Sequence, residues 1–152
     1  MEFIQWNKSL ETGIELIDEQ HKRIVDYIND LRVAQTKGDR NAVAKTIDDV
    51  IDYTQSHFGF EEVLLADAEY PLLNAHKKVH ELFIRRVSDL SLRFKNGEDN
   101  IAVEMHQLLG RWLINHIQKD DRHYVDSVKA KMVGVVADQT KRKGLLARFF
   151  GG

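Results

Sequence analysis

A near-absence of residues that interrupt helices is the feature that most constrains the fold of this chain. Its 152 residues include a single proline, Pro71, and its nine glycines are spread along the sequence. Proline is the least favourable residue in the interior of a helix, and glycine is the next least favourable. Apolar side chains also recur at alternating spacings of three and four residues, as they do on one buried face of a helix. The sequence therefore predicts a few long amphipathic helices.

Turn and capping residues divide the chain into four such helices. The first is expected to begin near Asp18, as its N-cap, and residues 37–39 (Lys-Gly-Asp) end it and begin the second. Pro71 fits the first turn of the third helix, and residues 96–100 (Asn-Gly-Glu-Asp-Asn) form a turn before the fourth. Four amphipathic helices with short connections predict an all-α fold, an antiparallel up-down-up-down four-helix bundle with an N-terminal arm and a short C-terminal helical extension.

A chain of this length can bury the core of one domain. We expect residues 1–137 to form the bundle and residues 138–152 to form a basic and apolar tail, in which Lys141, Arg142 and Lys143 precede four large apolar side chains. Such a tail is a candidate for docking on an anionic membrane surface or on a protein partner. A frayed or packed chain end is the alternative.

Charge and cysteine content exclude several classes of function. A formal net charge of −2 provides no global field that would recruit nucleic acid. Residues 1–10 lack the apolar core of a signal peptide and no later stretch is long enough to span a bilayer, so we expect a cytoplasmic protein. The chain has no cysteine, which excludes disulfides and thiolate ligands.

Five of the seven histidines lie on the apolar stripes of these helices, together with carboxylates. His57 and Glu61 are four residues apart, as are His76 and His80, so each pair shares one helix face. Polar groups in a bundle core are costly unless they have partners. A set of this size exceeds the four ligands of a tetrahedral zinc and suits two adjacent metals that share carboxylates. Imidazole and carboxylate without thiolate favour iron, and then manganese or zinc.

The carboxylate that accompanies His116 is ambiguous from helical geometry. Asp120, four residues later, would lie on the same face of a regular helix. Asp121, five residues later, would lie about 140° around the axis. Helical geometry alone therefore favours Asp120.

The full ordered set resembles the hemerythrin family, specifically the single-domain bacterial hemerythrins, over most of the chain. The motifs are Asp18-Glu19-Gln20-His21, His57-Phe58-x-x-Glu61-Glu62, His76-x-x-x-His80 and Trp112-Leu113-x-x-His116-Ile117-x-x-x-Asp121-x-x-Tyr124. The resemblance implies that His76, His80 and His116 hold one iron, that His21 and His57 hold the other, and that Glu61 and Asp121 bridge them with an oxo or hydroxo group. It selects Asp121, so the fourth helix must distort between Gln118 and Asp121, by a π-type turn or by ending there.

The function that this resemblance implies is reversible O₂ binding by two iron ions that alternate between Fe²⁺ and Fe³⁺. The iron with two histidines keeps an open position for O₂ or a small anion, and Phe58, Trp112 and Leu113 are candidates for the wall of a dry pocket, with ordinary core packing as the alternative. We expect oxygen storage, delivery or scavenging, and not an enzyme. The alternatives are a sensor that acts through a separate partner and a di-iron enzyme that consumes peroxide or nitric oxide.

The remaining polar residues near these motifs receive weaker predictions. His106 and His123 match no family ligand and are expected at the surface or in support of the ligands. Glu62 points about 100° away from Glu61 and is expected at the surface, as is Asp120 once Asp121 is chosen. Tyr124 is expected either to form a hydrogen bond near the site or to pack.

Overall fold

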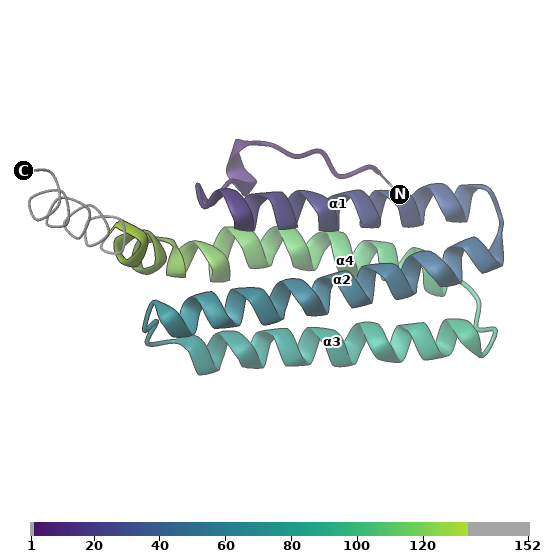
Figure 1. Ribbon diagram of the computed structural model, residues 1–152. Helices are drawn as coiled ribbons and strands as arrows, with labels where there is room; N and C mark the ends of the chain where they lie inside the picture. Colours follow the sequence, from purple (N-terminus) through teal and green to yellow (C-terminus); the bar gives the residue numbers. More distant parts are fainter. Residues whose placement is uncertain (1, 134–152) are drawn as a thin grey trace, which may run out of the picture.

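Four long helices form the body of the molecule in the computed structural model, which describes residues 2–133. These helices are α1 (Glu15–Thr36), α2 (Arg40–Asp67), α3 (Leu73–Lys95) and α4 (Ile101–His116). Successive helices run in opposite directions and are joined by short turns (Figure 1). This arrangement confirms the predicted all-α, up-down-up-down bundle. An N-terminal arm with a 3₁₀ turn, η1 (Lys8–Leu10), lies along α1.

The chain continues beyond α4 as one turn of π-helix, η2 (Ile117–Asp121), and then as α-helix over residues 122–133. The predicted distortion between Gln118 and Asp121 is therefore confirmed as a π-type turn. A π-helix closes its hydrogen bonds from residue i to residue i+5, so Asp121 returns to the face of His116 five residues earlier. The helical extension beyond the bundle is visible in Figure 1.

The turn between α1 and α2 forms as predicted. Gly38 has a left-handed backbone with φ of 69°, and Asp39 caps α2 by accepting from the backbone N–H groups of Asn41 at 3.0 Å and Ala42 at 3.1 Å. Gly38 thus supplies the conformation that other residues adopt only with strain. Asp39 supplies the acceptor that the first turn of a helix lacks.

The predicted N-cap at Asp18 is wrong, because α1 begins at Glu15 with Ile14 as its N-cap. The buried carboxylate of Asp18 instead accepts from the backbone N–H and hydroxyl of Thr12, both at 2.8 Å, and from the N–H of Gly13 at 3.0 Å. A charge-assisted cluster of this kind fixes the end of the arm against α1.

Pro71 also lies outside the helix to which it was assigned, since α3 begins two residues later at Leu73. The N–H of Leu73 donates to the carbonyl of Tyr70 at 3.2 Å, which places Pro71 in the turn that precedes the helix. Proline suits the second position of such a turn because its φ is already fixed there.

The buried apolar side chains form two clusters at different levels of the bundle. The larger cluster extends from Ile24 and Phe58 toward the connection between α3 and α4. The smaller one includes Ile17, Leu65 and Tyr124 near the opposite end. Along the chain, the histidines and carboxylates singled out in the sequence lie next to or between residues of these two clusters. The polar interior is therefore enclosed by apolar layers above and below.

No helix within residues 2–133 is long and apolar enough to cross a membrane. The tail over residues 138–152, with its proposed docking role, lies outside the described residues, as does the end of the predicted bundle domain at residue 137. Both remain predictions.

Candidate metal centre

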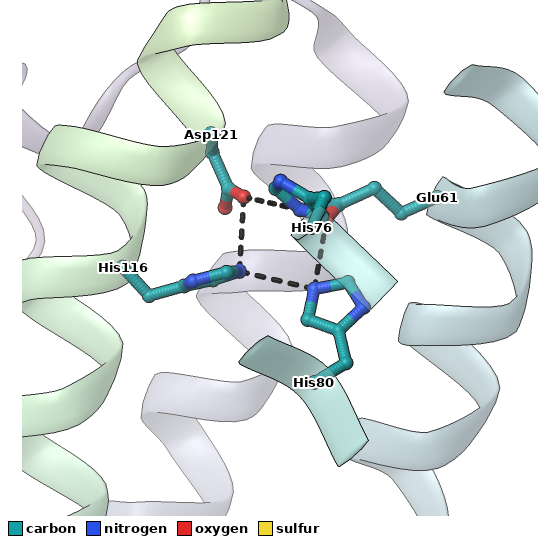
Figure 2. A group of neighbouring side chains, drawn as sticks. All are labelled: Glu61, His76, His80, His116 and Asp121. Atoms are coloured by element: carbon teal, nitrogen blue, oxygen red, sulfur yellow. Dashed lines mark hydrogen bonds and ion pairs between the residues drawn. The ribbon is translucent and has the colours of Figure 1, made fainter. Parts of the chain in front are cut away.

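The seven side chains that the sequence singled out as metal ligands converge inside the bundle. None of them is more than 5% exposed. They form two overlapping groups, and within each group the donor atoms lie within 4.8 Å of one another. The larger group contains Glu61, His76, His80, His116 and Asp121 (Figure 2), and the smaller contains His21, His57 and Glu61.

Glu61 belongs to both groups because its two carboxylate oxygens face different histidines. Its Oε1 lies 2.6 Å from Nε2 of His76 and 3.2 Å from Nε2 of His80. Its Oε2 lies 3.2 Å from Nε2 of His57. One carboxylate thus reaches both halves of the centre, as a ligand shared by two metals must.

Asp121 divides its oxygens in the same way. Oδ1 lies 3.0 Å from Nε2 of His116 and 3.3 Å from Nε2 of His76, whereas Oδ2 lies 3.1 Å from Nε2 of His21. The side chain of Asp120 turns outward to the other nitrogen of His116. The π-helical turn η2 therefore brings Asp121, rather than Asp120, into the interior.

Several of these buried atoms have no hydrogen-bond partner within residues 2–133. They are both nitrogens of His21, Nε2 of His57 and both oxygens of Asp121. Although His21 and Asp121 approach to 3.1 Å, their atoms are not aligned for a hydrogen bond. Unpartnered polar atoms in a dry interior are costly, and two cations between them would remove that cost. The all-nitrogen-and-oxygen donor set fits iron.

The electrostatics of the cluster show strong coupling between imidazoles and carboxylates. Burial alone would raise the pKa of Glu61, but the close approach of His57, His76 and His80 to its carboxylate holds that pKa well below its usual value. Burial and the charge of Glu61 would likewise raise the pKa of Asp121, yet His116 and His21 lower it. Both carboxylates are therefore ionised and able to bind cations at neutral pH.

Two of the histidines carry a proton on both ring nitrogens in the metal-free protein. Burial lowers the pKa of His76, but the nearby carboxylates of Asp121 and Glu61 outweigh burial and raise that pKa to about 9. Burial also lowers the pKa of His116, and the charge of Asp121 outweighs it and raises the pKa to about 10. Protons thus occupy positions that a metal must take over.

Four further polar residues form hydrogen bonds with the ligand set, and of these bonds the sequence analysis considered only that of Tyr124. Three of them accept from the outer Nδ1–H of a histidine, because an amide or carboxylate oxygen can only accept. These contacts are Gln20 with His57 at 2.6 Å, Glu62 with His80 at 3.1 Å and Asp120 with His116 at 2.8 Å. Such contacts fix the tautomer, so that Nε2 presents its lone pair to the interior.

The fourth of these residues, Tyr124, is fully buried and donates its hydroxyl to Oε2 of Glu61 at 3.0 Å. Of the two roles expected for Tyr124, the hydrogen bond near the site is confirmed. Glu62 and Asp120 were predicted to be surface residues only, and this prediction missed their contacts with the centre. Both are partly exposed, at 25% and 42% of the side chain, but each also binds a histidine of the centre.

Aromatic rings cover the outer side of the three-histidine group. Phe58 stacks on His80 with ring centroids 3.7 Å apart, and Trp112 stacks on His116 at 4.2 Å. Trp112 also lines an outward-facing cavity of about 460 Å³ beside Asp120. Leu113 is 4% exposed and belongs to the larger apolar cluster.

The two histidines outside the set behave differently from each other. His123 is exposed, as expected. His106 is only 5% exposed and belongs to neither group of donors, so its expected surface position is wrong. It lines a cavity together with Ile4 of the N-terminal arm, which approaches α4 at Gly110.

Comparison with known proteins agrees with this centre. Residues 12–128 match the family model described as the Hemerythrin HHE cation binding domain. The chain is 49% identical to a bacteriohemerythrin of Pseudomonas aeruginosa, over 99% of this chain and 100% of that protein. It is 34% identical to a bacteriohemerythrin of Methylococcus capsulatus, over 74% of this chain and 86% of that protein.

The fold has the same relatives. A crystal structure of wild-type hemerythrin matches with a TM-score of 0.78 and 30% identity, and the match covers 84% of this chain and 98% of that one. This chain belongs to the hemerythrin family, among its bacterial members, as shown by the match to the family model, the 49% identity to a bacteriohemerythrin over nearly the whole chain and the similarity to the hemerythrin structure.

Proposed function

We propose that this protein binds O₂ reversibly at a non-haem di-iron centre, for oxygen storage, delivery or scavenging. The observation that carries the proposal is the division of the oxygens of Glu61 and Asp121 between two groups of histidines. His76, His80 and His116 would hold one iron, His21 and His57 would hold the other, and the two carboxylates would bridge them together with an oxo or hydroxo group.

The two irons would supply two electrons and one open coordination position for O₂. The open position follows from the donor count. His76, His80 and His116, with the two carboxylates and the bridge, would supply six ligands to one iron, whereas His21 and His57 would leave the other iron one ligand short. An open position is where a small ligand enters, and small anions such as azide would compete there.

The protein's own contribution is to hold the donors still and to exclude water. Tyr124 orients Glu61, and burial raises the pKa of its phenol well above the usual value, so the hydroxyl stays protonated as a donor. Leu113 lies one turn before His116 on the same helix face, where an apolar side chain would shield the bound ligand. Ile24 and Phe58 extend the same apolar layer.

A binding role agrees better with these contacts than turnover does. Within the described residues, Glu61 and Asp121 each lie within 3.3 Å of histidine nitrogens of the centre, and the phenol of Tyr124 donates to Glu61. We therefore propose a carrier or store rather than an enzyme. A sensor is the second candidate and would act through a separate partner.

The test is the absorption spectrum of iron-loaded, reduced protein during cycles of air and argon. The proposal predicts a charge-transfer band that appears in air and disappears under argon over repeated cycles. Oxidation in the first exposure to air, with no recovery of the reduced form under argon, would contradict reversible binding and favour the sensor or an enzyme.

A further inference from the structure

The two halves of the metal centre differ in what lies behind their histidines. In the three-histidine half, two rings donate from Nδ1–H to carboxylates. His80 donates to Glu62 at 3.1 Å and His116 donates to Asp120 at 2.8 Å. Two of the three imidazoles in this half therefore have a negative charge directly behind them.

Within the part of the chain that the structure describes, no carboxylate accepts from Nδ1 of either histidine in the two-histidine half. His57 donates to the neutral amide oxygen of Gln20 at 2.6 Å, and Nδ1 of His21 has no hydrogen-bond partner within residues 2–133. The difference does not come from burial, since His21, His57, His80 and His116 are each at most 3% exposed. It comes from the residues that α1, α2 and η2 place behind the rings.

A carboxylate behind an imidazole changes how that imidazole binds a metal. It holds the ring in one tautomer and one orientation, and its charge draws the Nδ1 proton and raises the electron density at Nε2. A neutral amide orients the ring equally well but adds no charge. Glu62 and Asp120 also keep contact with water, at 25% and 42% exposure of their side chains, so neither carboxylate incurs the cost of full burial.

We propose that Glu62 and Asp120 are positioning residues that act through His80 and His116 and make the three-histidine half the tighter of the two metal sites. That half fills first. The two-histidine half, whose metal would carry the open position, fills second and exchanges its metal more readily. This inference rests on the ligand assignment of the proposed function, but not on O₂ binding.

The test is a titration of the metal-free, full-length protein with Co²⁺, whose visible bands report the coordination of each bound ion. The parent protein should bind two equivalents in resolved steps, the first tighter. Glu62→Gln and Asp120→Asn keep the size and a hydrogen-bond acceptor while they remove the charge. Each should weaken the first step by about 10–100-fold and shift the bands of the first ion, with a much smaller effect on the second step.

Gln20→Glu is the reciprocal variant, because it places a carboxylate behind His57. It should strengthen the second step by about tenfold and leave the first step near its parent value. Asp52→Asn removes an exposed carboxylate elsewhere on α2, and it is the control for the change in net charge. Both steps should stay within about twofold of the parent in this control.

The outcomes separate this inference from the ligand assignment. If two Co²⁺ ions bind but Glu62→Gln and Asp120→Asn weaken both steps equally, or neither step, the positioning role is overturned and the two-metal assignment stands. The same holds if Gln20→Glu leaves the second step unchanged. If the parent binds one Co²⁺ only, the ligand assignment and the positioning role fall together.

Discussion

Replacement of Leu113 by alanine separates a pocket wall from ordinary core packing. The side chain is 4% exposed and lies one helical turn before His116. The substitution removes three carbon atoms, at about 0.8 kcal/mol of lost burial for each. The cavity left behind adds to that loss, so we expect a total destabilisation of about 2–5 kcal/mol.

Leu90 is the matched control because it is equally buried, at 2% exposure, but lies on α3 farther from the centre. Leu90→Ala should lower stability by a similar amount, about 2–5 kcal/mol. For a chain of this size, either variant should lower the midpoint of thermal unfolding by roughly 4–20 °C. The two variants should therefore lose similar stability and differ only in how close the substituted residue lies to the centre.

Their effects on oxidation should differ. A cavity beside polar groups admits water, and water or an anion beside the centre promotes loss of the reversible oxygenated state. Leu113→Ala should therefore lose its oxygenated spectrum in air faster than the parent at fixed pH, while Leu90→Ala should decay at the parent rate. If both variants decay at the parent rate, Leu113 is plain core and the pocket assignment is wrong. If both decay faster to the same extent, general destabilisation accounts for the effect.

Three further predictions concern the ligands. Asp121→Ala should bind less than one iron per chain by metal analysis. Asp120→Ala should bind iron more weakly than the parent but still reach two irons per chain at saturation. Equal loss of iron in both variants would refute the assignment of Asp121 as the bridge. The affinity of the metal-free protein for Co²⁺ should rise from about pH 6 to pH 9. The pKa values of His76 and His116 are raised to about 9 and 10, so the metal must displace a proton from each of them. An affinity that falls or stays level over this range would contradict those protonation states. Azide should alter the charge-transfer spectrum of the ferric parent, and His57→Ala should abolish that response; an unchanged parent spectrum would mean that no open position exists.

Much of the candidate site could be predicted from the sequence because helices repeat regularly. His57 and Glu61, like His76 and His80, are one turn apart, and the apolar residues around them place them on buried stripes. Helical periodicity failed at Asp121. Only the local change to π-helical hydrogen bonding brings this residue to the interior, and the family resemblance, not the spacing, identified it.

The contacts that sequence reasoning missed all join separate elements or depend on exact chain geometry. Glu62 on α2 meets His80 on α3, a pairing between helices that no spacing within one helix predicts. His106 is buried beside a cavity that the N-terminal arm also lines, and the arm shows no helical pattern in the sequence that would predict this. Asp120 was expected at the surface once Asp121 was chosen, but it accepts from the outer nitrogen of His116.

The most direct test of the central claim is the stoichiometry of iron and O₂ in the same preparation. The account predicts two irons per chain by metal analysis, and one O₂ taken up for each pair of irons when the reduced protein is exposed to air. It also predicts that argon recovers that O₂. A single metal per chain at full occupancy, such as one zinc, or O₂ consumption that continues past one molecule for each iron pair, would contradict a di-iron carrier.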